Sequence, residues 1–312
     1  MRSCLVTGGA GFIGSHIAAA LLARGDRVRI ADNLSTGYRH NVDAAGKVEF
    51  LEGDLAEADF AARAVAGVDL VFHQAAIPSV PRSVKDPATS HRANIEASLN
   101  VLLAARDAGV TRVVYAGSSS AYGDTPVLPK REDMPPNPRS PYALQKLVAE
   151  QYCALFTQLY GLETVTIRYF NVFGPRQDPS SAYSGVISQF AKALTEGRSP
   201  TIYGDGGQTR DFTYIDNVID GVLRAAAAPE ASGEVINVAT GGRISLLELF
   251  QTMKRITGAG VDPVFAEGRA GDVRDSQADI SKAKRLLGYE PVVSFEEGLA
   301  KTIAWYNSST SS

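Results

Sequence analysis

A group of glycines that follows the first apolar run of the chain constrains the fold more than any other feature. Cys4-Leu5-Val6 is typical of a buried strand, and Gly8, Gly11 and Gly14 follow it. Glycines at this spacing let the backbone turn tightly and approach a diphosphate closely. A glycine triplet alone also occurs in ordinary turns, so the prediction of a dinucleotide site depends on the segments that come next.

Those segments complete a strand, helix and strand unit. A helix is predicted from Phe12 to Arg24, with Gly25 just beyond its C-terminus, so its N-terminal amides and dipole would face the phosphates. A second strand, Arg27 to Ala31, leads to Asp32, eighteen residues after Gly14. A carboxylate at about this spacing accepts hydrogen bonds from the adenosine ribose, which favours NAD over NADP.

The third predicted strand, Val48 to Glu52, extends the expected cofactor site. Asp54 follows it and either reaches the adenine or caps the next helix. The open alternative to NAD binding is a site that has lost its cofactor. The predicted NAD contacts are Gly8, Gly11, Phe12, Ile13, Gly14, Asp32, Asn33, Asp54, Leu55, Tyr142 and Lys146.

Composition narrows the class of protein. With 312 residues, 45% hydrophobic and 21% charged, the chain is typical of a soluble globular enzyme. Its net charge of -3 gives no basis for binding nucleic acid, and no apolar run is long enough to span a membrane. Cys4 and Cys153 lack the number and spacing of a disulfide framework or zinc site, and the four histidines have no metal-ligand spacing. We expect a cytoplasmic protein without a metal.

Strand and helix patterns alternate through the first half of the chain. This alternation predicts an α/β fold, a Rossmann-type doubly wound parallel sheet whose ligands bind beyond the C-terminal strand ends. Long loops at 75–87, 117–140 and 171–183 are expected at that edge. The predicted elements are strands Leu70 to His73, Arg112 to Ala116 and Thr164 to Ile167, and helices at about Thr89 to Arg106 and Pro141 to Tyr160.

After Phe170 the alternation breaks down, which indicates a smaller, interleaved α/β substrate domain. We expect an NAD-binding domain over 1–170 plus about 209–240, and a substrate domain over about 171–208 and 241–312. The predicted elements here are a helix over Val186 to Glu196, an extended segment over Ser199 to Tyr203, a strand over Glu234 to Val238 that returns to the main sheet, and a helix over Ile244 to Thr257 with a capping box formed by Ser245 and Glu248.

A tyrosine and a lysine near the start of one predicted helix suggest acid-base chemistry. Ser140 and Pro141 are typical of the first positions of a helix, so Tyr142 and Lys146 lie four residues apart on one face. A neighbouring ammonium favours the phenolate, and we expect Lys146 to lower the pKa of Tyr142 so that it acts as a general base. An isolated pair of this kind usually faces solvent, but here it accompanies a dinucleotide motif.

A serine run follows the strand predicted at Arg112 to Ala116, at the same sheet edge. We expect Ser118 to hydrogen-bond the reacting hydroxyl, whereas Ser119 and Ser120 are equally well explained as turn residues. The run lacks the second glycine of a nucleophile elbow, which argues against a serine hydrolase.

Together these motifs resemble the extended short-chain dehydrogenase/reductase family, in particular its NAD-dependent UDP-sugar 4-epimerases. The resemblance covers nearly the whole chain and implies NAD, a UDP-sugar and a homodimer formed through the two long helices. It assigns Ser118, Tyr142 and Lys146 to catalysis. It assigns substrate binding to Ser118, Tyr142, Asn171, Arg210, Arg269, Asp272 and Ser276. The motifs that carry it are the glycine motif, His73-Gln74-Ala75-Ala76, the serine run, Tyr142 with Lys146, Arg168 to Pro175, and Gly207 to Phe212.

The resemblance also implies a reaction. Related dehydratases carry an Asp-Glu pair, and related decarboxylases a Glu, where this chain has Ser119 and Ser120. What remains is oxidation at the sugar C4, rotation of the 4-keto sugar and return of the hydride, which inverts C4 without net redox. UDP-glucuronate 4-epimerase stays open, although Asn171 stands where those enzymes typically have Thr. A non-catalytic NAD-responsive binding protein of the same fold also stays open.

The choice of sugar depends on the pocket wall. Family members carry either Tyr or a small residue four positions after the Asp of the Arg-x-Gly-Asp segment, and counting from Asp272 gives Ser276. A small residue there permits an N-acetyl group. We therefore expect UDP-GlcNAc and UDP-GalNAc as substrates beside UDP-glucose and UDP-galactose, in agreement with a loop at 178–183 that resembles that of N-acetylhexosamine epimerases.

Overall fold

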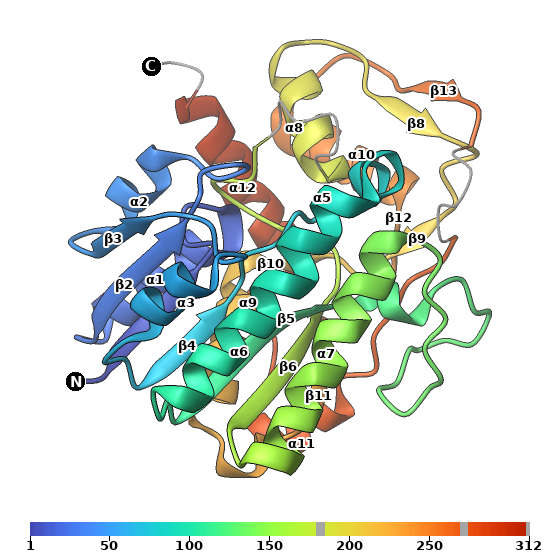
Figure 1. Cartoon of the computed structure of the whole chain (residues 1–312). Helices are drawn as coiled ribbons and strands as arrows, with labels where there is room; N and C mark the ends of the chain where they lie inside the picture. The colour runs from blue at the N-terminus through green and yellow to red at the C-terminus, as the bar shows by residue number, and fades with distance from the viewer. Residues whose placement is uncertain (179–184, 269–273, 310–312) are drawn as a thin grey trace.

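A seven-stranded parallel sheet forms the centre of the molecule (Figure 1). The computed structural model describes residues 1–178, 185–268 and 274–309. The strand order β11-β6-β5-β4-β1-β2-β3 confirms the predicted Rossmann-type doubly wound sheet. The strands are β1 (Ser3–Thr7), β2 (Arg27–Asp32), β3 (Glu49–Glu52), β4 (Leu70–His73), β5 (Arg112–Ser118), β6 (Glu163–Tyr169) and β11 (Val235–Val238).

Helices cover both faces of this sheet, which explains its nearly continuous apolar strands. Successive strand residues point to opposite faces. Leu5 therefore packs in the cluster with α3, α6 and α7, whereas Val6 packs in the cluster with α1 and α9. The helices are α1 (Phe12–Ala23), α2 (Arg39–Ala45), α3 (Ala58–Val65), α4 (Val80–Lys85), α5 (Pro87–His91), α6 (Ala97–Asp107), α7 (Pro141–Tyr160), α8 (Val186–Thr195), α9 (Ile215–Ala227), α10 (Leu246–Thr257), α11 (Ser281–Leu287) and α12 (Phe295–Ser309).

The later part of the chain adds a smaller layer beside this sheet (Figure 1). Helices α8, α10 and α12 pack together there, with the rings of Phe190 and Phe250 in edge-to-face contact. The chain returns to the main sheet where β11 pairs with β6 in parallel, as the pattern at 234–238 predicted. Three strand pairs complete this part: β7 (Val172–Phe173) with β10 (Thr213–Tyr214), β9 (Thr209–Arg210) with β12 (Ile244–Ser245), and β8 (Thr201–Tyr203) with β13 (Val264–Ala266).

Several predicted elements were wrong in detail because tertiary contacts altered them. The helix predicted over Thr89 to Arg106 is interrupted by a π-helical turn, Arg92–Glu96. In this turn the buried Asn94 accepts a hydrogen bond from the Ile77 N–H at 2.7 Å and donates one to Gln145 at 2.8 Å. The loop predicted at 75–87 contains α4, which begins at the side-chain cap Ser79.

The capping box at Ser245 and Glu248 is confirmed, although Ile244 and Ser245 form a strand before the helix. None of the helices in the described part of the chain is long and apolar enough to cross a bilayer.

Candidate active site

A cavity of about 580 Å³ opens at the C-terminal ends of the central strands. This is the edge where open parallel sheets bind their ligands. Residues that follow β1, β2, β3, β4 and β5 in the sequence all contribute to its wall. The structure brings together every predicted NAD contact, because Gly8, Gly11, Phe12, Ile13, Gly14, Asp32, Asn33, Asp54, Leu55, Tyr142 and Lys146 all line this one cavity.

The glycine motif forms a tight cradle at the start of α1. Gly8 has a φ of +67°, and a Cβ added to it would lie 2.6 Å from the backbone nitrogen of Ala75. A Cβ on Gly14 would collide with the carbonyl oxygen of Gly8. Gly11 occupies the N-cap of α1 and has no side chain to satisfy the free amides there. The cradle therefore suits a phosphate group held by backbone N–H groups and the helix dipole.

Asp32 places a carboxylate at the end of β2, where it is 8% exposed. It accepts hydrogen bonds from the N–H groups of Ala10 at 3.0 Å and Leu34 at 2.8 Å. Burial raises the pKa of Asp32, and these hydrogen bonds oppose the rise. Its oxygens retain acceptor capacity for ribose hydroxyls, so cradle and carboxylate together fit a dinucleotide.

Asp54 does not cap a helix, so that alternative is wrong. Helix α3 begins after Glu57, and Asp54 instead accepts a hydrogen bond from the Ala56 N–H at 2.9 Å. Its other oxygen lies 3.0 Å from Arg92. The turn after β3 and this ion pair hold the carboxylate at the cavity wall.

The three predicted catalytic side chains meet in the same cavity. Ser118 ends β5, whereas Tyr142 and Lys146 lie on α7, which Ser140 caps by accepting from the Ala143 N–H at 3.1 Å. The Ser118 hydroxyl lies 2.8 Å from that of Ser120. This arrangement is suited to removing a proton from a bound hydroxyl.

The predicted direction of the Tyr142 pKa was wrong. Burial raises the pKa of Tyr142, and a hydrogen bond with Ser118 only opposes that rise. Burial also lowers the pKa of Lys146 to about 7. The Lys146 ammonium nitrogen lies 4.4 Å from the ring centroid of Tyr115. Desolvation penalises the charged form of both groups, and it outweighs the attraction that the helical spacing suggested.

The predicted substrate residues fall in two places. Asn171 lines the cavity, with a φ of +35°. Arg210 lies on β9 outside the described cavity wall, where it donates to the carbonyl oxygens of Thr209 and Arg274, both at 2.9 Å. Ser276 lies beside it, because its N–H donates to the Thr209 oxygen at 3.1 Å. Arg269 and Asp272 lie outside the described residues.

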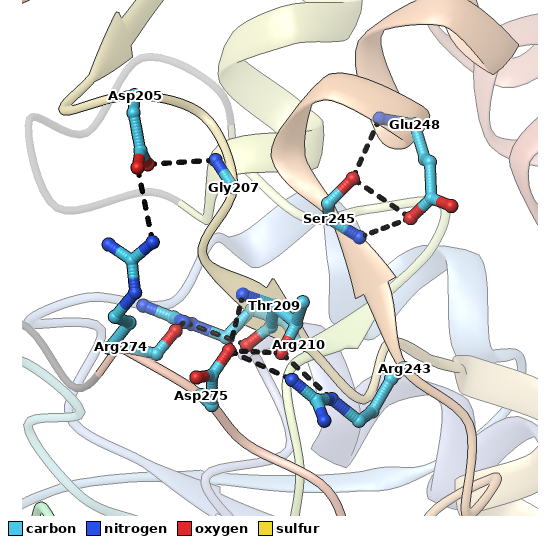
Figure 2. A network of polar contacts seen from close by, with 9 residues as sticks. All are labelled: Asp205, Gly207, Thr209, Arg210, Arg243, Ser245, Glu248, Arg274 and Asp275. Carbon is cyan, nitrogen blue, oxygen red and sulfur yellow. Dashed lines mark hydrogen bonds and ion pairs between the residues drawn. The ribbon is translucent and has the colours of Figure 1, made fainter.

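A polar network surrounds Arg210 and Asp275, the residue before Ser276 (Figure 2). Asp275 accepts from the Thr209 hydroxyl at 2.5 Å and pairs with Arg243 at 3.2 Å. Arg274 pairs with Asp205 at 3.1 Å. Through these contacts β9 is held against the segment that carries Ser276.

Sequence reasoning missed several cavity residues. Arg82, which the sequence analysis did not assign to the site, lines the cavity. The sequence signal that could have identified Arg82 is its position in the long segment 75–87, which was predicted to lie at the C-terminal ends of the strands. Other missed lining residues are Tyr38, Asn41, Gln74, Tyr169, Arg176 and Gln177.

The sheet is doubly wound, and its cavity contains the glycine cradle, the carboxylate at the end of β2 and the Ser-Tyr-Lys group. These features together define a dinucleotide-binding protein of the short-chain dehydrogenase/reductase class. Residues 4–239 match the family model described as the NAD dependent epimerase/dehydratase family. The chain therefore belongs to that family and uses NAD as its cofactor, and the resemblance seen in the motifs is confirmed.

Similar proteins are named UDP-sugar epimerases. A UDP-glucose 4-epimerase of Mycolicibacterium smegmatis is 41% identical over 97% of both chains. A Thermotoga maritima UDP-glucose 4-epimerase solved with UDP-glucose has a TM-score of 0.95 at 38% identity, and 99% of each chain is covered. A UDP-N-acetylglucosamine 4-epimerase from Methanobrevibacter ruminantium M1, solved with UDP-N-acetylmuramic acid, has a TM-score of 0.94 at 39% identity, also over 99% of each chain.

Proposed function

We propose that this protein interconverts the C4 epimers of UDP-hexoses. The observation that carries the proposal is the single cavity that contains both the dinucleotide cradle and the side chains of Ser118, Tyr142 and Lys146. UDP-GlcNAc with UDP-GalNAc, and UDP-glucose with UDP-galactose, are the proposed substrate pairs. The names of the two similar solved structures support this range.

The proposed chemistry assigns one role to each catalytic side chain. When bound beside the sugar, NAD would accept a hydride from the sugar C4 and return it. Ser118 holds the sugar 4-hydroxyl, and Tyr142 accepts its proton and later returns it. Protonated Lys146 stabilises the Tyr142 phenolate. The Lys146 pKa of about 7 allows this lysine to carry its proton near neutral pH.

Rotation of the 4-keto sugar requires a firmly held UDP group and a loosely held sugar. We assign UDP binding to Asn171, Arg210, Arg269 and Asp272, with the two arginines on the diphosphate, because guanidinium groups match phosphate oxygens. Ser276 is proposed to border the sugar and to leave space for an N-acetyl group.

We assign the domain formed by 1–170 plus about 209–240 to NAD binding, and the domain formed by about 171–208 and 241–312 to UDP-sugar binding.

A panel of UDP-sugars tests this proposal. The purified protein is incubated separately with UDP-GlcNAc, UDP-glucose and UDP-glucuronate, and the products are identified by NMR while absorbance at 340 nm is followed. We expect C4 epimers to form with no net reduction of added NAD. Stoichiometric reduction of NAD would contradict epimerisation, and turnover of UDP-glucuronate alone would favour the glucuronate epimerase alternative.

We also propose a homodimer that forms through α6 and α7. Leu144 and Leu155 on α7 are exposed by 50% and 45%, and a second hollow between these helices is lined by Leu99, Val148 and Tyr152. Pairing two copies would bury this apolar surface. Light scattering on the wild type and on Leu144→Asp tests it: a monomeric wild type would contradict the proposal.

A cytoplasmic location is proposed as well, since both thiols are buried and free.

A further inference from the structure

Arg176 is a cavity residue that neither the sequence motifs nor the proposed mechanism uses. It follows β7 and lines the same cavity as the glycine cradle. Its φ of +66° places it in the left-handed region, which is uncommon for a residue other than glycine. Its guanidinium donates one long hydrogen bond, 3.4 Å, to the Ala44 carbonyl oxygen. Its Nη1 atom is buried and has no hydrogen-bond partner.

The contrast with Arg168 shows why this matters. Arg168 is a buried guanidinium whose Nη1 atom also has no hydrogen-bond partner, but its charge is paired with Glu150 through two hydrogen bonds of 2.9 and 2.6 Å. No such carboxylate pairs with Arg176 in the described parts of the chain. Burial without an opposite charge lowers the pKa of Arg176. A half-buried cation at a cavity wall, with no carboxylate partner and one buried donor left over, is expected to find its partner in an anionic ligand.

The position of Arg176 indicates which anion this is. The segment Gly174–Asp178 lies against the cofactor half of the molecule. The His16 Nε2–H, on α1, donates to the Pro175 oxygen at 3.0 Å. The Tyr38 hydroxyl, just before α2, donates to Asp178 at 2.6 Å. Arg176 is therefore held beside α1 and α2, close to the glycine cradle.

We infer that Arg176 binds the diphosphate of the cofactor. The inference rests on the proposed cofactor position in the glycine cradle. A guanidinium would offer the phosphates a charged donor in addition to the backbone amides of α1. The diphosphate of UDP has the same chemistry, but Arg210, its proposed ligand, lies on β9 outside this part of the cavity wall.

The test separates diphosphate binding from adenosine binding. Calorimetry on the full-length protein after release of NAD measures the affinities of ADP and of adenosine, and calorimetry on the NAD-saturated protein measures UDP. We expect Arg176→Met to weaken ADP binding about 10- to 100-fold, the usual effect of losing a charge-assisted hydrogen bond. Adenosine and UDP binding should not change, and Arg176→Lys should recover part of the ADP affinity. The amount of NAD that copurifies should be highest for the wild type, lower for Arg176→Lys and lowest for Arg176→Met.

Two further variants make the outcome decisive. Asp32→Ala should weaken ADP and adenosine equally, because its proposed partner is the ribose. Arg285→Met, an exposed residue of α11, should change nothing. Intact adenosine binding by Arg176→Met shows that this variant is folded. If Arg176→Met weakened UDP binding but not ADP binding, or weakened neither, the inference would be overturned. If Asp32→Ala also had no effect, the proposed cofactor position itself would be wrong.

Discussion

At the scale of single residues, burial rather than proximity sets the chemistry of the site. Lys146 is 4% exposed, and its ammonium group lies over the ring of Tyr115. The helix places Tyr142 and Lys146 on one face, as their spacing predicts. Burial nevertheless raises the pKa of Tyr142 and lowers that of Lys146 to about 7, so the charged form of each group is less favoured than it would be in water.

Replacing Tyr142 with Phe tests its role as the base. The change removes only the hydroxyl, so the fold and the bound NAD should remain. Turnover should fall about 100- to 10,000-fold, the usual contribution of general acid-base catalysis. The epimerisation rate by NMR and the NAD content by absorbance measure the two effects. Near wild-type turnover would show that another group takes the proton.

The pKa of Lys146 predicts how stability depends on pH. Its pKa is about 7 in the folded protein and ordinarily 10.5, so the unfolded chain binds more protons between those values. The penalty for burying the charged form is therefore fully present below pH 7 and disappears as the pH rises toward 10.5.

We thus expect Lys146→Met to be more stable than the wild type at pH 6, with the difference shrinking by pH 10. Urea denaturation of the NAD-free protein at several pH values measures this. Lys85→Met, a change at an exposed residue of α4, is the control and should show no such trend. A difference that stays constant with pH would contradict the assignment.

At the scale of elements, a buried ion pair joins helix α7 to the sheet. Arg168 on β6 pairs with Glu150 on α7, and their side chains are 4% and 7% exposed. Arg168 also lies over the Tyr122 ring, 4.5 Å from its centroid. Because α7 carries Tyr142 and Lys146, this pair helps to fix these two cavity residues relative to the strands whose ends form the cavity.

Removing the charge of Glu150 should therefore be costly. Glu150→Gln leaves the Arg168 guanidinium buried without its counter-ion, which is expected to cost about 3 to 5 kcal/mol in the free energy of unfolding. Asp133→Asn removes one member of an exposed pair with Arg131 and should cost less than about 1 kcal/mol. Urea denaturation of both variants measures the difference. Equal losses would show that burial does not govern the Glu150 pair.

At the scale of the whole molecule, the site is assembled from segments that are far apart in the sequence. The cavity wall includes the glycines after β1 and also Asn171 and Arg176 beyond β6. Arg210 and Ser276 come together only because β9 pairs with the segment at 274–276. We therefore propose that substrate choice depends on this assembly and not on one motif.

Ser276→Tyr tests whether that assembly sets the choice of sugar. If Ser276 borders the sugar, the added ring should exclude an N-acetyl group but leave space for a hydroxyl. Activity on UDP-GlcNAc should then fall at least about tenfold more than activity on UDP-glucose, as expected for a steric clash of 1 to 3 kcal/mol. Paired NMR assays measure both rates. Equal losses on the two sugars would place Ser276 away from the sugar.

Local sequence patterns determined the elements whose signal lies within one short stretch of chain. The glycines with Asp32, the helix from Pro141 to Tyr160 and the capping box at Ser245 and Glu248 are of this kind. The helix and the capping box depend on spacing along one helix, and the glycines with Asp32 depend on spacing within one strand, helix and strand unit.

Tertiary structure alone decided what depends on contacts between distant segments. Asn94 holds its π-helical turn through Ile77 and Gln145, and Asp54 is held by Arg92. The direction of the Tyr142 pKa and the unpaired Nη1 of Arg176 likewise follow from burial. Desolvation depends on everything that packs around a group, and most of those neighbours are remote in sequence, so no local pattern could reveal it.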